Sequence, residues 1–424
     1  MKKFYFFGLL SSLFMLSSMQ SHSQGCVPVR STGSNNVIER PTYSKKAKQP
    51  KWTFTANNRY FRSFRHFVGG EEQKQRVENG TEVINKSYTL DLNAVRYINR
   101  RWSVSVNVPF IANTRSSLYE HGGTMRKSTE AVGLGDARLT AYRWMLNPKK
   151  FKKANFQTGL GIKLPTGNYK AEDYFFTGTN GDKVLGPVDQ SIQLGDGGTG
   201  LISEVNAFYN LNRKVSLYSN LYYLVNPRET NGVSTARGRT PSANAIVYGS
   251  HVMSVPDQYM ARVGANVSIS KFTFSGGVRI DGVPVRDLVG GSNGFRRPGY
   301  IIAAEPGVTF RSKKLTTFLN VPVALERNRL QSVPDKIRSE LTKSYYKGDA
   351  AFADYVVNLG LSFNLLSKNK KKTPTNNNIQ NYFNQYRSSS FERNIKRTIE
   401  EYSKAKNEAK KKSGDSGYRK TVEL

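Results

Sequence analysis

The sequence is nearly without the residues that form disulfides or bind metals, since it has one cysteine and four histidines among 424 residues. A single cysteine, Cys26, excludes an internal disulfide, so packing and backbone hydrogen bonds must stabilise the fold. The histidines do not occur with cysteines or carboxylates at the spacing of a metal site. We therefore expect neither a metal nor a cofactor.

Acidic residues are also scarce, because 31 Asp and Glu stand against 64 Lys and Arg and leave a net charge of +33. In a cytoplasmic protein this balance would favour nucleic acid as a partner. Here the N-terminus indicates export, because Lys2 and Lys3 precede a short apolar run that ends in small residues before a cleavage site after Ser23. We predict a signal peptide over residues 1–23. Export makes nucleic acid a poor partner and favours membrane lipid and lipopolysaccharide.

The lone cysteine lies two residues after the start of the predicted mature chain, Gln24. The run Ser23-Gln24-Gly25-Cys26 therefore has a second interpretation as a lipoprotein site with Cys26 acylated. The aliphatic residue that is usual at the −3 position of such sites is missing. An ordinary cysteine in a flexible segment is the interpretation that we favour.

Long hydrophobic runs are absent after residue 23, where no stretch approaches the ~20 apolar residues of a spanning helix. Apolar residues alternate instead with polar or small ones, as in the segment from Trp102 to Phe110. Strand side chains point to opposite faces with a period of two, so each such segment has one apolar and one polar face. Twelve segments follow this pattern, at residues 51–66, 85–98, 101–112, 132–146, 153–165, 199–212, 214–226, 257–270, 272–282, 298–311, 314–326 and 351–366.

The connections between these segments alternate in length. Five are tight turns, such as Asn99-Arg100 and Asn212-Arg213, and the six others are long and polar, such as residues 167–198. An up-and-down barrel with periplasmic turns and extracellular loops has this alternation. The sequence therefore predicts an all-β fold, a transmembrane antiparallel β-barrel of about twelve strands over residues 51–366. Both chain ends would be periplasmic, and the barrel would lie in the outer membrane of a Gram-negative cell.

Two segments flank the predicted barrel. Residues 24–50 are rich in Pro, Ser, Asn and Lys, which is typical of a flexible segment, here periplasmic. Residues 367–424 contain a basic run and a polar linker, followed by one predicted amphipathic helix with the apolar stripe Phe391, Ile395, Ile399 and Tyr402. We expect this periplasmic tail to dock onto a protein or onto peptidoglycan through the stripe. A solvated helix without a partner is the alternative.

Charged residues within the predicted strands can be assigned to the inner face, because a charge facing hydrocarbon costs a few kcal/mol near the midplane. The assignment gives a lumen with charges of both signs. The candidates are Asp91, Asp136, Arg138, Lys163, Glu204, Arg262, Arg279, Asp281 and Glu305. These groups either line a pore or pair across the barrel and fill it, and a bore of about twelve strands is compatible with both.

Catalysis has little support in the sequence. An outer-membrane lipid hydrolase needs a histidine beside a serine on the lipid-facing wall. His66 lies near Ser63 in the chain, but such proximity is common by chance. We expect no catalytic residue and no enzyme, and we keep a lipid hydrolase only as the least favoured alternative.

Three glycine-rich motifs carry a resemblance to a known family. They are Gly133-Leu134-Gly135-Asp136, the run from Gly159 to Gly167, and Leu194-Gly195-Asp196-Gly197. Each adjoins a predicted strand, and together they resemble the family of outer-membrane barrels named for the meta-cleavage pathway of phenol degradation, over residues 85–365. The resemblance implies an outer-membrane channel for small, often apolar or aromatic solutes, and it assigns no substrate residues. The serine-rich signal and the Gln24 start are similar to those of envelope proteins of Bacteroidota.

These observations predict a passive channel or transporter for small solutes, and the resemblance implies that these include apolar or aromatic ones. The alternative is a non-conducting barrel that anchors or assembles an envelope complex through its basic tail. An open lumen would favour the channel. A lumen blocked by paired charges or by residues 24–50 would favour the anchor.

Overall fold

The computed structural model describes residues 24–25, 50–123, 125–177, 181–312, 314–366 and 389–412. The predicted signal peptide, Cys26 and the rest of residues 26–49 lie outside the described residues. The chain divides into two units, residues 1–367 and 368–424. No helix of the described part is long and apolar enough to cross a membrane.

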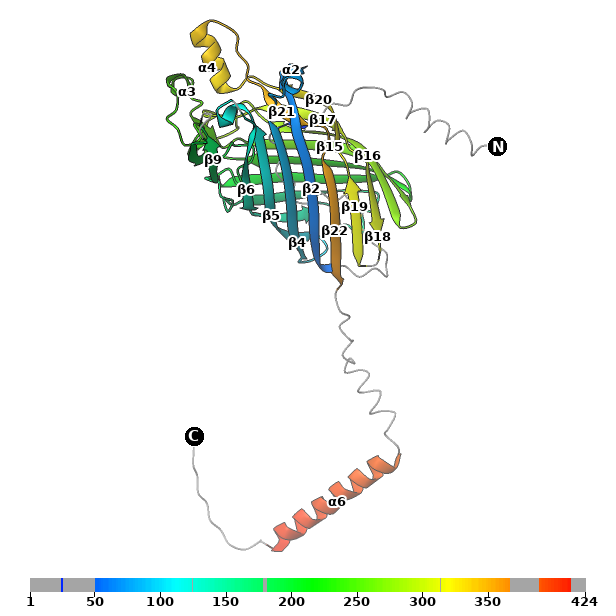
Figure 1. Cartoon of the computed structure of the whole chain (residues 1–424). Coiled ribbons are helices and arrows are strands. Elements are labelled where there is room, and N and C mark those ends of the chain that lie inside the picture. Colours follow the sequence, from blue (N-terminus) through cyan, green and yellow to red (C-terminus); the bar gives the residue numbers. More distant parts are fainter. Residues whose placement is uncertain are drawn as a thin grey trace, which may run out of the picture. The chain divides into compact units, whose positions relative to one another are not determined.

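The first unit contains the predicted barrel of twelve antiparallel wall spans (Figure 1). Four of the spans are interrupted and are counted as two strands each. The spans are β2 (Pro50–Val68), β4 (Ile84–Tyr97), β5 (Trp102–Ser117), β6 (Lys127–Leu134) with β7 (Arg138–Trp144), β8 (Ala154–Lys163), β11 (Gly200–Asn210), β12 (Val215–Val225), β15 (Gln258–Ile269), β16 (Phe272–Val283), β17 (Gly299–Ala304) with β18 (Gly307–Arg311), β19 (Leu315–Asn320) with β20 (Val323–Arg329), and β21 (Ala350–Ala353) with β22 (Val357–Leu366). The first span closes the barrel by pairing with the last, in the register Phe54↔Phe363.

Exposure alternates along the wall as the sequence predicted. On β5, Val106 is 44% exposed on the outer face, whereas its neighbour Asn107 is 2% exposed on the inner face. Leu160 on β8 and Leu221 on β12 are likewise exposed outside. An apolar outer face on a closed sheet is the surface that contacts membrane lipid, so the protein belongs in the cell outer membrane.

The interruptions coincide with residues that disturb a ladder. Gly135 to Ala137 separate β6 from β7, and proline occurs in two other breaks, at Pro306 and Pro322. Proline has no N–H to donate, so it is tolerated where a strand bends or its pairing changes. An isolated bridge, Val323↔Tyr355, joins the start of β20 to the break between β21 and β22. The two-residue strand β1 (Gln24–Gly25) pairs with β21 there, through Gln24↔Ala353 and Gly25↔Phe352.

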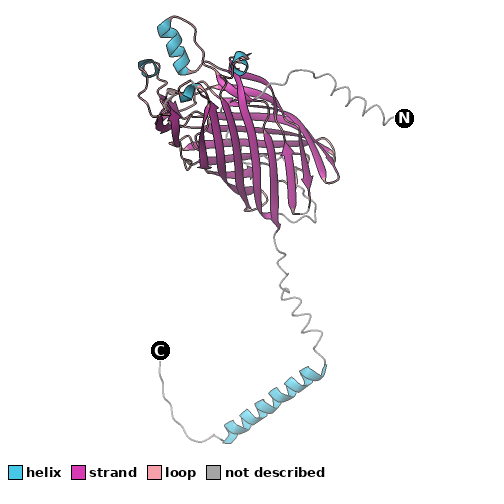
Figure 2. Cartoon of the chain, in the orientation of Figure 1, coloured by secondary structure: helices cyan, strands magenta, loops and turns pink. Residues whose placement is uncertain are grey.

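The long connections gather at one end of the barrel and the tight turns at the other, as predicted (Figure 2). The long connections contain structure that the sequence did not predict. Its elements are β3 (Glu71–Glu72), α2 (Gln75–Glu78), η1 (Tyr119–His121), β9 (Glu172–Phe176), β10 (Lys183–Pro187), β13 (Thr230–Ser234), α3 (Ala243–Val247), β14 (Val252–Ser254) and α4 (Val333–Thr342). Some walls also extend further toward this end than predicted, since β5 reaches Ser117 and β20 reaches Arg329. These extensions lie beyond the part of the wall that faces lipid. Their sequences therefore do not alternate between apolar and polar residues.

The second unit contains α6 (Ser389–Lys412), the helix predicted for the tail. Ile395, Ile399 and Tyr402 are exposed on it. The side chain of Phe391, the fourth residue of the predicted stripe, lies outside the described residues.

The sidedness of β5 can be tested with two nearly isosteric substitutions, Val106→Asp and Asn107→Asp. A carboxyl at Val106 would face hydrocarbon and should lower the free energy of unfolding by on the order of 1–2 kcal/mol. A carboxylate at Asn107 would lie opposite Arg138 on the inner face and should cost much less. Urea titration of the folded, heat-modifiable form in phospholipid vesicles measures both. Equal destabilisation by the two changes would contradict the register described here.

Candidate functional site

The inner face of the barrel is the candidate functional site, and all nine lumen candidates from the sequence lie on it. Each of these side chains is at most 8% exposed. Hydrogen bonds and ion pairs hold most of them in groups along the wall, three of which are described below.

The first group contains four charges on the strands from β15 to β18. Arg262 and Arg279 face each other across β15 and β16, a like-charge pair that is unfavourable by itself. Carboxylates offset it, because Arg262 Nη1 lies 3.2 Å from Glu305 Oε1 and Arg279 Nε donates to Asp281 Oδ1 at 2.8 Å. Glu305 also accepts from the amide of Asn320. The group is therefore neutral in total and polar throughout.

The second group is centred on Glu204 of β11. Its carboxylate accepts hydrogen bonds from the Tyr142 hydroxyl at 2.8 Å, from Asn206 Nδ2 at 3.0 Å and from Asn220 Nδ2 at 3.1 Å. These donors come from β7, β11 and β12, so one carboxylate reaches across β8 and ties non-adjacent spans together on the inner face. Three neutral donors thus provide hydrogen bonds to both oxygens of the Glu204 side chain.

The third group joins Lys163 to two aspartates. Lys163 Nζ lies 3.7 Å from Asp136 Oδ2 and is also in direct contact with the carboxylate of Asp196. Lys163 is 1% exposed, so its charge depends on these two partners. Asp196 belongs to the long connection of residues 167–198, which we predicted as an extracellular loop.

That connection folds inward near its end, and the sequence did not predict this. Val188, Ile192 and Leu194 are buried against Ile111 of β5 and Ala131 of β6. Hydrogen bonds hold the segment as well, because Asn113 Nδ2 donates to the Ile192 carbonyl at 3.1 Å and Arg115 Nη1 donates to the Ser191 hydroxyl at 3.3 Å. We call residues 188–198 the inward segment. It covers part of the inner face of β5 to β7 and narrows the lumen there.

The three glycine-rich motifs meet at the base of the inward segment. Asp136 Oδ1 accepts from the Gly167 amide at 3.0 Å, and its Oδ2 accepts from the Asp196 amide at 3.2 Å. A Cβ on Gly195 would lie 2.5 Å from Asp136 Oδ1, so only glycine allows this approach. The motifs that carry the family resemblance therefore anchor a loop and do not themselves form a binding site.

A second cluster, which the sequence did not reveal, lies among the loops above the inner face. Arg115 Nη2 lies 2.7 Å from Glu120 Oε1, Arg297 Nη2 lies 2.8 Å from Asp189 Oδ2, and Arg237 Nη2 lies 2.7 Å from Glu120 Oε1. We call these five residues the mouth cluster. Burial by itself would raise the pKa of Asp189, but the three arginines outweigh it and hold that pKa well below its usual value. The residues of the mouth cluster come from β5, η1 and three loops, where neither periodicity nor a motif marks them.

The histidine weighed for catalysis has another role. The His66 ring accepts at Nε2 from the Val83 amide and therefore donates from Nδ1 to Asp349 Oδ2, both at 2.8 Å. Burial alone would raise the pKa of Asp349, but His66 and Arg76 hold it well below its usual value. The hydroxyl oxygen of Ser63 accepts from Asn85 Nδ2 at 3.0 Å. Both ring nitrogens of His66 thus form hydrogen bonds with groups other than Ser63. The pair of His66 and Asp349 anchors a loop.

Comparison with known proteins gives a likeness in structure alone. No family model matches the sequence, and no curated protein matches it. An outer-membrane channel from Pseudomonas putida F1 matches with a TM-score of 0.50 at 11% sequence identity, over 76% of this chain and 98% of that one. The toluene transporter TbuX of Ralstonia pickettii matches with a TM-score of 0.35 at 10% identity, over 77% of this chain and 92% of that one, which is too weak to carry an argument. The first match shows that this chain has the fold of an outer-membrane channel barrel.

The anchoring role of Asp136 predicts the effect of Asp136→Ala. Loss of its two bonds to backbone amides should free the base of the inward segment, because charge-assisted hydrogen bonds contribute about 1.5–3 kcal/mol each. Hydrogen exchange measured by mass spectrometry should then speed up at least about tenfold at Gly167 and Asp196, with β11 and β12 unchanged. Glu172→Ala, an exposed acid in the same connection, is the matched control. Unchanged exchange at Gly167 and Asp196 would show that other contacts hold the segment.

Proposed function

We propose that the protein is an outer-membrane channel through which small solutes diffuse passively. The supporting observation is a closed membrane wall whose inner face carries polar and charged side chains, in the fold of an outer-membrane channel barrel. Some buried polar atoms of this face, among them Arg138 Nη1, Arg262 Nη2 and Asp281 Oδ2, have no hydrogen-bond partner among the described residues. A buried ionic group that lacks a partner costs several kcal/mol in a dry interior. Water molecules bound between these groups would remove this cost, and the polar inner face is the path that we propose for small solutes.

The lining supports a narrow path with no strong preference for one sign of charge. Basic and acidic side chains are both distributed around the wall, and the inward segment covers part of it. A narrow polar path suits small hydrated molecules. The apolar or aromatic solutes implied by the family resemblance remain a prediction, and they form a separate arm of the test.

The proposal is tested by single-channel conductance of the mature protein in planar bilayers. We expect measurable steps, and larger ones from Asp136→Ala, because the released inward segment no longer narrows the lumen. Glu172→Ala should conduct like the parent protein. Liposome uptake of small sugars and of toluene then separates hydrated from aromatic solutes. The channel is refuted if neither the parent nor Asp136→Ala conducts or admits any of these solutes.

An additional role for the tail is supported by the exposed apolar stripe of α6. We propose that Ile395, Ile399 and Tyr402, which lie on one face of a helix otherwise rich in Lys and Arg, dock onto a periplasmic protein or onto peptidoglycan. An isolated helix of this composition gains little from its own contacts, so burying the stripe against a partner would stabilise it. The anchor alternative requires this contact, whereas a channel does not.

Crosslinking in whole cells tests the tail. Ile395→Asp with Ile399→Asp should abolish crosslinks from α6 to envelope components while the barrel stays heat-modifiable. Ser403→Asp with Asn407→Asp adds the same charge at the same spacing off the stripe, and it should keep the crosslinks. If the parent tail gives no crosslink to protein or peptidoglycan, the helix is a solvated extension.

A further inference from the structure

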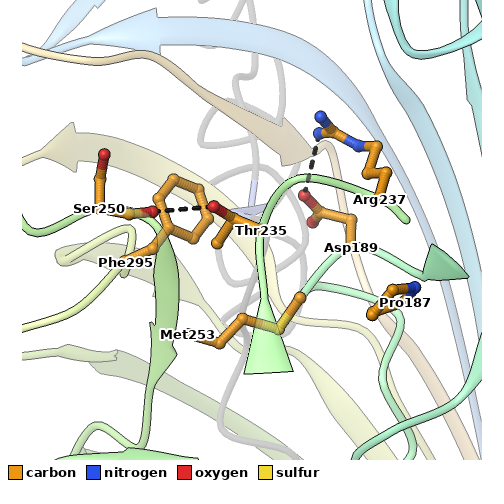
Figure 3. A pocket seen from close by; sticks show the side chains of 7 residues that line it. All are labelled: Pro187, Asp189, Thr235, Arg237, Ser250, Met253 and Phe295. Carbon is orange, nitrogen blue, oxygen red and sulfur yellow. Dashed lines mark hydrogen bonds and ion pairs between the residues drawn. The ribbon is translucent and has the colours of Figure 1, made fainter. Parts of the chain in front are cut away.

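The loops of the mouth enclose a cavity of about 190 Å³ (Figure 3). Pro187 at the end of β10, Met253 of β14 and Phe295 form its apolar part. Asp189, Arg237 and Thr235 form its polar part. Pockets for drug-sized ligands have volumes of about 300–1,000 Å³, so this one suits a smaller molecule. It is distinct from the lumen groups on the barrel wall.

The mouth cluster by itself carries more positive than negative charge. It contains three arginines, Arg115, Arg237 and Arg297, and two carboxylates, Glu120 and Asp189. Both oxygens of Asp189 accept from Arg297, at 3.0 and 2.8 Å, so this carboxylate is already engaged. Asp349 also lies close enough to Arg297 to interact with it electrostatically. An anion entering the cavity would therefore be attracted chiefly to Arg237, the arginine that lines it.

Arg237 is the residue best placed to receive that anion. It lines the cavity, and its side chain keeps 32% of its surface exposed while Nη2 bonds to Glu120. Its Nε is buried and has no hydrogen-bond partner among the residues that the structure describes. Arg237 also has a φ of 54°, a left-handed conformation that is costly for a residue with a side chain and is found at ligand sites.

The backbone around Arg237 is held firmly in this conformation. A Cβ on Gly186 would lie 2.2 Å from the Arg237 carbonyl carbon, and one on Gly238 would lie 2.2 Å from the Leu185 carbonyl oxygen. The β9–β10 hairpin and the turn after β13 are thus in direct backbone contact. On the opposite side, Thr235 Oγ1 donates to the Ser250 carbonyl at 2.9 Å, and Gln190 Nε2 donates to the Phe295 carbonyl at 3.1 Å. The cavity is therefore formed before a ligand arrives.

We propose that this cavity binds a small monocarboxylate with a compact apolar body, of about the size of benzoate. The carboxylate would pair with the partly exposed guanidinium of Arg237, and the apolar body would pack against Met253 and Phe295. The face of the Phe295 ring is already occupied by Arg297, 4.7 Å from the ring centroid, which leaves the rest of the ring for the ligand. The site would collect such solutes at the entrance of the proposed channel. Only this last role rests on the proposed function, because binding does not require conduction.

Calorimetric titration of the full mature protein in detergent with sodium benzoate tests the proposal. Benzoate should bind, and benzamide, which is nearly isosteric and neutral, should bind at least about tenfold more weakly, because it loses the charge-assisted hydrogen bond. Arg237→Gln should weaken benzoate binding by a similar factor and leave benzamide binding unchanged. Arg239→Gln removes an exposed arginine two residues away that does not line the cavity, and it should bind benzoate as the parent does.

The outcomes separate this site from the channel proposal. Met253→Phe should fill the cavity and abolish binding, and heat-modifiability on a gel reports whether each variant is folded. Equal affinity for benzoate and benzamide, no binding of either, or an equal loss in Arg237→Gln and Arg239→Gln would refute the carboxylate site. Conductance measured on the same preparations is independent of these results. Refuting the carboxylate site therefore does not refute the channel, and refuting the channel does not refute the site.

Discussion

A peptide N–H or C=O that enters hydrocarbon has no water to bond, and leaving it unpaired costs several kcal/mol. This constraint requires each wall span to pair with neighbours, and the pairing of β2 with β22 removes the two edges that an open sheet would expose. Closure then dictates the side chains. Because residues alternate between the two faces of each strand, the charged residues at membrane depth point inward, and the interior becomes charged.

A charged interior brings its own constraint, which is that each ion must be neutralised or hydrated. The inner face meets it in local groups, in which the two facing arginines of β15 and β16 are offset by Glu305 and Asp281. The charge of Lys163 is neutralised by two aspartates, one from the wall and one from the inward segment. An ion pair that crosses from wall to loop couples the shape of the lumen to the position of that loop. The same pair thus contributes to folding and holds the inward segment against the wall.

The strands and the sides of their residues could be predicted from sequence because both follow from a period of two. Val106 and Asn107 are assigned to opposite faces by that period alone, and the nine lumen candidates follow from the same rule. The inward turn of residues 188–198 could not be predicted, because a loop that packs on an inner wall needs only a few apolar residues at irregular spacing. The mouth cluster was missed for a related reason. Arg115, Asp189 and Arg237 are far apart in the chain, and charged loop residues are ordinarily solvated.

The glycine-rich motifs show how a sequence resemblance relates to function in this fold. Asp136, Gly167 and Asp196 meet because a carboxylate caps two backbone amides and glycine permits the close approach. Their geometry anchors the inward segment and does not depend on the chemistry of a solute. A barrel that carries these motifs can therefore share a narrowed lumen with this one and still differ in what it admits. Selectivity would then be set by the loop residues around the mouth, where Arg237 and Phe295 lie outside every motif that carried the resemblance.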